Sequence, residues 1–185
     1  MELTTGAHYA AAVPKAVPQP ARLRAAQYLC AALVGLFGVV AQAAEAGAQE
    51  TWPRVWLNPG IYSYHFDSSK GLRNNNIGFG AEVMLNDDHV LMAGTFTNSN
   101  DATSHVFGYQ WRPLHWRFSG VDVGAGILIG AFDGYPNYRQ GGWFVAPLPM
   151  LSVEGRRLGA NFGIIPTIKN KFDGAFAIQV KLRVW

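Results

Sequence analysis

An alternation of side chains with a period of two residues, in residues 77–99, constrains the fold more than any other feature of this sequence. Ile77, Phe79 and Val83 fall at odd positions, while glycine, glutamate and methionine fill the even positions up to Met84. Successive side chains of a β-strand point to opposite faces, so the pattern indicates a strand with two different faces. The Asn and Asp residues at 86–88 favour a tight turn, and a second alternating run follows them. The pattern predicts a β-hairpin that ends in the polar residues 98–101.

The same alternation recurs after residue 60, and no segment there has the period of a long helix. Proline cannot donate to a β-ladder, so we expect Pro147 and Pro149 to break the pairing of the sixth strand and Pro166 that of the seventh. The short turns fall at residues 86–88, 112–114 and 155–156. The predicted strands are residues 60–67, 77–85, 90–97, 103–111, 116–131, 143–154, 157–166 and 174–185.

Eight two-faced antiparallel strands are expected to close into a barrel, because closure removes the exposed edges that promote aggregation. The apolar face points inward in a soluble lipocalin-like carrier and outward, towards lipid, in an outer-membrane barrel. In the last strand, Val180 and Leu182 share one face, and Lys181 and Arg183 share the other. A secreted chain that ends in such a strand with a terminal aromatic, here Trp185, is typical of outer-membrane proteins. We therefore predict an all-β fold, an eight-stranded antiparallel transmembrane β-barrel of the outer membrane.

The start of the chain has the features of a secretory signal. Arg22 and Arg24 precede an apolar run at residues 28–40, and small residues follow at 41–43. A membrane anchor is the alternative, but the run is shorter than the roughly 20 residues of a spanning helix. We expect residues 1–44 to be a cleavable signal peptide with an N-terminal extension, 45–59 a short periplasmic segment and 60–185 the barrel.

Composition argues against several other functions. The net charge is +3, with no sustained cluster of Lys and Arg, so nucleic-acid binding has no support. Cys30 is the only cysteine and would be removed with the signal. His89, His105 and His115 lack metal-ligand spacing with a carboxylate or cysteine, so we expect no metal and no cofactor. On the inner face, Glu82 is expected to pair with Arg117 or Arg183 in a structural network.

Two polar residues are predicted to meet at the outer end of the barrel. With an even number of strands, the loops after strands one, three, five and seven lie at the end opposite the termini. His65 and Ser99 share that rim, both facing the lumen, on strands whose backbones are roughly 10 Å apart. A histidine that withdraws the proton of a serine hydroxyl is suited to acyl transfer. A rim hydrogen bond without catalysis is the alternative.

Several segments resemble, in the same order, the lipid A palmitoyltransferase (PagP) family, over about residues 61–185. The resemblance implies an eight-stranded outer-membrane enzyme that moves a palmitoyl chain from a phospholipid to lipid A. It implies membrane lipids as partners, and we expect a monomer. The similar segments are Tyr64-His65, Gly78-Phe79-Gly80, Phe96-Thr97-Asn98-Ser99, Gly108-Tyr109-Gln110-Trp111, Arg112-Pro113-Leu114, Pro147-Leu148-Pro149 and Ile165-Pro166.

Carried over by position, the resemblance assigns catalysis to His65 and Ser99 and places Asn98 at the position of an aspartate, for which Asp101 or Asp67 could compensate. Gln110 stands where the family has a small glycine in the floor of the acyl pocket, so we expect it to shorten or close the pocket. Pro147 and Pro166 stand at prolines that open gaps in the wall for a lipid tail. Asn98 and Gln110 favour the alternative, a non-catalytic barrel that binds lipid or stabilises the membrane.

Overall fold

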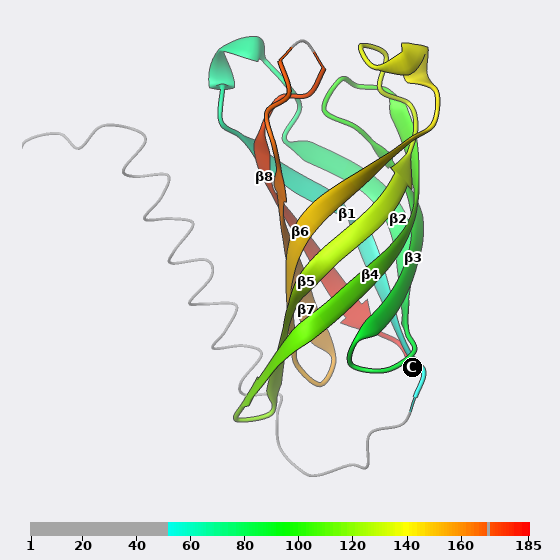
Figure 1. Ribbon diagram of the computed structural model, residues 1–185, viewed down its shortest axis with the longest axis vertical. Helices are drawn as coiled ribbons and strands as arrows, with labels where there is room; N and C mark the ends of the chain where they lie inside the picture. The colour runs from blue at the N-terminus through cyan, green and yellow to red at the C-terminus, as the bar shows by residue number, and fades with distance from the viewer. Residues whose placement is uncertain (1–51, 170) are drawn as a thin grey trace, which may run out of the picture. The chain divides into compact units, whose positions relative to one another are not determined.

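The alternating segments fold as eight antiparallel strands that pair in sequence order and close into a barrel (Figure 1). β1 pairs with both β2 and β8, so the sheet has no free edge. This confirms the predicted all-β, eight-stranded antiparallel barrel. The strands are β1 (Arg54–His65), β2 (Asn75–Met84), β3 (His89–Thr97), β4 (Thr103–Phe118), β5 (Val121–Phe132), β6 (Phe144–Glu154), β7 (Leu158–Ile165) and β8 (Ala175–Arg183).

The structure, a computed structural model, describes residues 52–169 and 171–185. The predicted signal peptide at residues 1–44 lies outside these residues, as do residues 45–51 of the predicted periplasmic segment. Within the described residues, no helix is long and apolar enough to cross a membrane.

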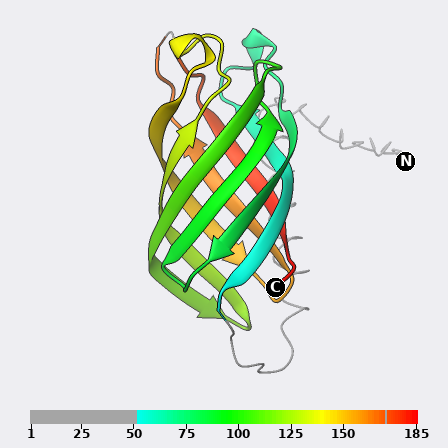
Figure 2. The same ribbon diagram turned by 90° about the vertical axis from the view of Figure 1, so that its right-hand side faces the viewer.

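The connections between strands fall into two sets at opposite ends of the barrel, as Figures 1 and 2 show. The short turns that follow β2, β4 and β6 lie at one end, together with the C-terminus, and we call this the turn end. The longer loops lie at the other end, the loop end. They contain two short 3₁₀-helices, η1 (Ser68–Lys70) and η2 (Arg139–Gly141).

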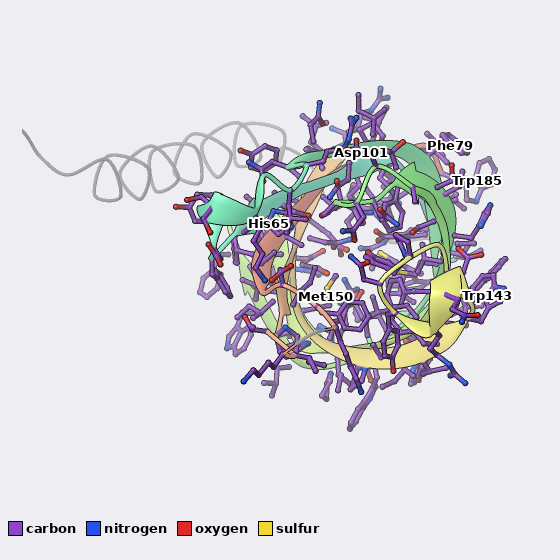
Figure 3. The ribbon with its side chains drawn as sticks, turned by 90° about the horizontal axis from the view of Figure 1, so that it is seen from above. His65, Phe79, Asp101, Trp143, Met150 and Trp185 are labelled. Carbon is purple, nitrogen blue, oxygen red and sulfur yellow. The ribbon has the colours of Figure 1, made fainter. Side chains whose placement is uncertain are left out.

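Large apolar side chains cover the outside of the barrel. On β8, Val180 and Leu182 are each 48% exposed, whereas Lys181 between them is 2% exposed. Figure 3 shows Phe79, Trp143 and Trp185 outside the ring of strands and Met150 inside it. The apolar face of β8 therefore points outward, which is the opposite of the lipocalin-like arrangement.

Two prolines that the sequence suggests as strand boundaries lie within strands instead. β1 begins at Arg54, ahead of residue 60, and continues through a register shift at Pro59. β4 continues through residues 112–114, where a turn was predicted, with a one-residue register shift around Pro113. A β-bulge leaves the extra residue unpaired, so a proline there costs no ladder hydrogen bond. The inward-facing residues also change between even and odd sequence positions at each bulge.

The turn between β4 and β5 lies at Ser119-Gly120 and not at residues 112–114. Both turn residues have positive φ, 46° at Ser119 and 79° at Gly120. This is the geometry of the two-residue hairpin turn, whose twist matches that of the flanking strands. The bulge around Pro113 keeps the apolar residues of β4 on the outside up to this turn.

The pairing of β6 is complete on one side and partial on the other. Its ladder with β5 runs from Phe144 to Glu154, but its ladder with β7 covers only Met150 to Glu154. Pro147 and Pro149 have no N–H to donate, which accounts for the missing pairs at the loop end. β7 itself ends at Ile165, directly before Pro166. In the loop-end half of the wall, β6 and β7 therefore do not pair with each other, at the prolines where the sequence predicts interruptions.

A buried ionic network occupies the interior at the turn end. The ammonium of Lys181 donates to Glu82 and to Glu154, each at 2.7 Å, and Arg112 donates to Glu154 at 2.8 Å. The prediction that Glu82 pairs with Arg117 or Arg183 was wrong. The bulges in β1 and β4 decide which residues face inward, and strand register brings Lys181 to Glu82.

Candidate functional site

The loop-end half of the interior contains a cavity of about 340 Å³. This size lies within the range of small-molecule sites, about 300–1,000 Å³. Most of its wall is apolar, and its polar residues come from β1, β2, β7 and β8 and from the loops after β3, β5 and β7. Apolar lining residues include Ile61, Met92, Phe96, Val106, Leu128, Phe132, Phe144, Leu148, Met150 and Ile165.

His65 is the last residue of β1 and lines this cavity. Its side chain is 8% exposed, and its Nδ1 lies 3.0 Å from Oδ1 of Asn74. An amide oxygen only accepts hydrogen bonds, so in this pair Nδ1 carries the hydrogen and donates it. The imidazole is thereby held in the tautomer whose Nε2 is free to accept a proton.

Ser99 follows β3 and lines the same cavity. Its backbone carbonyl accepts a hydrogen bond from the amide of Arg73, at 3.1 Å. Arg73 directly precedes Asn74, the residue that binds the imidazole of His65. The loop between β1 and β2 thus contacts both predicted site residues through consecutive positions. His65 and Ser99 both line this one cavity.

Asn98 lies outside the cavity lining, and its side chain organises the loop between β3 and β4. Its Oδ1 accepts from the backbone amides of Asn100 and Ala102, at 2.9 Å and 3.2 Å. Its Nδ2 donates to Oγ of Ser104 and to the carbonyl of Gly134, both at 2.8 Å. These contacts use the polar atoms of a fully buried amide. The side-chain partner of His65 is Asn74 and not Asn98.

The two aspartates considered as substitutes for Asn98 have other partners. Asp101 accepts from Nε of Arg73 at 2.5 Å. Asp67 caps η1 by accepting from the hydroxyl and the amide of Ser69, at 2.6 Å and 3.1 Å. The hydroxyl contact is the largest of the causes that lower the pKa of Asp67, followed by the amide contact. Both aspartates stabilise the loops at the loop end.

Gln110 is fully buried but is not among the residues that line the cavity. Its Nε2 donates to Oγ of Ser152 at 3.3 Å. The side chains of Met92 and Leu128 meet beside Gly108, two residues closer to the loop end on β4, and both line the cavity. Gln110 therefore lies outside the lining of the cavity that occupies the loop-end half.

Pro147 and Pro166 both line the cavity. They flank the part of the wall in which β6 and β7 do not pair, since that ladder begins at Met150 and Gly163. The two prolines that were predicted to open gaps in the wall therefore border the region in which β6 and β7 do not pair with each other.

Sequence reasoning missed several polar residues in the cavity lining and, in Asn74, one that binds a lining residue from outside it. Asn74 binds His65, and Nδ2 of Asn76 donates to Oγ of Ser63 at 2.8 Å. Asn161 and Gln179 line the cavity further from the loop end. For Asn161 and Gln179 the available signal was a polar residue within a predicted strand, whereas Asn74 and Asn76 fall between the predicted strands 60–67 and 77–85, where alternation gives no direction.

A cluster of aromatic rings covers part of the cavity at the loop end. The ring of Tyr135 lies 5.7 Å from that of Phe144 and 5.5 Å from that of Phe172. Tyr138 contacts the same two rings at 4.9 Å and 4.8 Å. Burial in this cluster raises the pKa of Tyr135 from 10.0 to about 12. The ring of Tyr135 lies in this cluster and forms part of the cavity wall.

The fold and the cavity define a class of protein: a closed eight-stranded β-barrel with an apolar exterior, a buried ionic network at one end and a His- and Ser-containing cavity at the other. No protein-family model matches the sequence, and no curated protein matches it. Within the described residues, no group of three or more His, Cys, Asp or Glu side chains is arranged to hold a metal ion.

Proposed function

We propose that this protein is an outer-membrane acyltransferase, similar to the PagP family, that moves an acyl chain from a phospholipid to lipid A. The observation that carries the proposal is the placement of His65 and Ser99 in the lining of one cavity whose remaining wall is mostly apolar. An acyl chain fits such a wall, and the two polar side chains would meet its carbonyl end.

The exterior supports a location in the outer membrane. Transmembrane barrels carry an outward apolar band with aromatic residues near both interfaces. Here Trp143 lies near the loop end, while Trp116 and Trp185 lie near the turn end, and all three are at least 45% exposed. β2 and β3 contain 10 and 9 residues, which suffices for a tilted strand that crosses the bilayer.

The proposed chemistry uses the free Nε2 of His65 as a general base. It takes the proton of an attacking hydroxyl, either that of Ser99 or that of the acceptor lipid held by Ser99. A bond forms between that oxygen and the acyl carbon, and the ester bond of the donor phospholipid breaks. The imidazolium then returns the proton to the departing glycerol oxygen. Where Ser99 is the attacking group, the acyl chain rests on its Oγ until His65 takes the proton of a lipid A hydroxyl, which attacks the acyl-serine ester; the bond to Oγ breaks and the proton returns to Ser99. Asn74 keeps the imidazole in the required tautomer throughout.

The unpaired segments of β6 and β7 are the proposed entry for the lipid tail. A tail that lies in the membrane can reach the cavity from the side only where the wall lacks a continuous ladder. Pro147 and Pro166 border such a region and line the cavity. Lateral entry would keep the chain out of water during transfer.

The test is mass spectrometry of lipid A from cells that produce the protein and from cells that lack it. We expect an additional acyl chain that disappears with Ser99→Ala and with His65→Gln. Ser69→Ala and His89→Gln are matched controls, because these side chains bind Asp67 and Tyr109 outside the cavity. Unchanged lipid A in cells with well-folded protein would overturn the proposal.

The second candidate is a non-catalytic barrel that binds lipid or stabilises the membrane. The side chain of Asn98 is occupied by its own loop, and the partner of His65 is a neutral amide, which favours this candidate. It predicts that the purified protein retains phospholipid while lipid A is unchanged. An acyl chain whose addition depends on Ser99 would exclude it.

A further inference from the structure

The loop between β3 and β4 presents two cavity residues on a tight turn. The backbone amide of Asp101 donates to the carbonyl of Asn98 at 3.0 Å, which closes a β-turn with Ser99 and Asn100 at its two central positions. Both central residues line the cavity. Consecutive Cα atoms are about 3.8 Å apart, so the side chain of Asn100 starts directly beside that of Ser99.

The backbone of this turn is held in place from two sides. Oδ1 of Asn98, a fully buried residue, accepts from the backbone amides of Asn100 and Ala102 at 2.9 Å and 3.2 Å. The carbonyl of Ser99 accepts from the amide of Arg73 at 3.1 Å, in the loop that also binds the site histidine. The position from which the side chain of Asn100 extends is therefore fixed by the fold.

The side-chain amide of Asn100 has no partner, unlike those of the asparagines around it. The side chains of Asn74, Asn76 and Asn98 each bind another side chain. Within residues 52–169 and 171–185, Asn100 makes a hydrogen bond only through its backbone amide. The residue is half-buried, and neither polar atom of its side chain is among the fully buried atoms that lack a partner. Its N–H groups are therefore accessible to a ligand.

Acyl transfer needs a hydrogen-bond donor of this kind. When a hydroxyl oxygen bonds to the acyl carbon, the π electron pair of the C=O bond moves to the carbonyl oxygen, which becomes an oxyanion. The pair returns when the ester bond to the donor glycerol breaks. Donors that are already in position stabilise the oxyanion without reorganisation, and an asparagine amide carries two N–H donors.

We propose that Nδ2 of Asn100 donates a hydrogen bond to this oxyanion, so that Asn100 is a further catalytic residue beside His65 and Ser99. This inference rests on the proposed acyl transfer and names the group that receives the developing charge. Asn98 is a positioning residue, because its side chain holds the turn. His65 moves the proton while Asn100 stabilises the charge, so the two roles can be separated by experiment.

The test is the steady-state rate of acyl transfer from phospholipid to lipid A by the full protein in mixed micelles. Asn100→Ala should lower kcat about 100-fold and change KM less than about twofold, since loss of one oxyanion donor costs about 10²–10³ in kcat. Asn100→Asp keeps the shape but has no N–H and repels the oxyanion, so it should be at least as slow. Asn75→Asp adds the same charge at an exposed position outside the cavity lining and should keep the original rate.

Two further measurements distinguish catalysis from a structural effect. The dependence of the rate on pH should keep its shape in Asn100→Ala, because His65 remains the base. A phospholipid with ether-linked chains has no acyl carbonyl and should bind Asn100→Ala as tightly as the unaltered protein. A kcat within about threefold of the original, or a loss of ether-lipid affinity that matches the loss of rate, would overturn the inference.

The outcomes separate this inference from the proposed function. If transfer to lipid A depends on Ser99 but not on Asn100, another group stabilises the oxyanion, and only the inference fails. If the unaltered protein transfers no acyl chain, the proposed function fails and the inference fails with it.

Discussion

His65 and Asn74 are joined by a hydrogen bond of 3.0 Å from Nδ1 to Oδ1, at the edge of a cavity that also contains Ser99. A neutral amide thus occupies the position at which a carboxylate often orients a catalytic histidine. It fixes the tautomer of the ring without adding charge.

Asn74→Ala should lower acyl transfer about tenfold, because the imidazole loses its orientation but keeps its basic nitrogen. Asn74→Asp should retain or exceed the original rate, since a carboxylate accepts the same hydrogen bond and stabilises the imidazolium. The measurement is the rate of transfer from phospholipid to lipid A in mixed micelles. The neighbouring Asn75→Ala is the control, and an equal loss in both variants would contradict an orienting role for Asn74.

Replacing Pro147 and Pro149 with valine should slow transfer without unfolding the barrel. Valine supplies the missing N–H groups and favours strand pairing, so the β6–β7 ladder can extend towards the loop end and close the wall. Initial rates with phospholipid in vesicles should fall. Rates with a short-chain soluble ester, which can enter from the loop end, should fall less. An unchanged rate with vesicles would argue against lateral entry.

Lys181→Met should destabilise the barrel strongly. The ammonium contacts both Glu82 and Glu154, and the three side chains are almost fully buried. Removing one member of a buried ionic group leaves uncompensated charge, at a cost of about 3–5 kcal/mol. The measurement is urea unfolding of the protein in lipid vesicles. Lys171→Met, at an exposed loop position, is the control and should change the free energy of unfolding little.

Deletion of Pro113 should prevent the barrel from forming, whereas Pro113→Ala should be tolerated. The register shift around Pro113 allows Trp111 and Leu114 both to face outward. Without the extra residue, the remainder of β4 would turn its apolar side chains inward. Folded barrels can be measured by their resistance to protease in vesicles. A protected barrel after the deletion would show that the bulge does not set the facing of β4.

The packing of the outer loops should weaken at high pH because of Tyr135. Its pKa is raised from 10.0 to about 12 by burial, so the neutral phenol is favoured in the folded state. This contribution to stability is complete below pH 10 and is lost as the pH rises to about 12. Ultraviolet absorbance of tyrosinate should show one late-titrating tyrosine that is absent in Tyr135→Phe. A titration identical in both proteins would contradict the burial of this group.

The sequence alone determined that the barrel would form and how it would be arranged. The alternation in residues 77–97 and in 174–185 specifies strands with one apolar face, and eight such strands require closure. The order of short and long connections places His65 and Ser99 at the same end. Local periodicity carries this information, because the direction of a side chain in a regular strand depends only on its position.

Tertiary structure decided which polar side chains meet. Pro59 and Pro113 resemble strand ends in the sequence, yet both lie in bulges that exchange the inward positions of β1 and β4. Asn74 was hidden in a loop, and the partner of Glu82 proved to be Lys181, ninety-nine residues away along the chain. Contacts of this kind depend on the register between strands, and a single bulged residue changes that register without changing the local pattern from which strands are predicted.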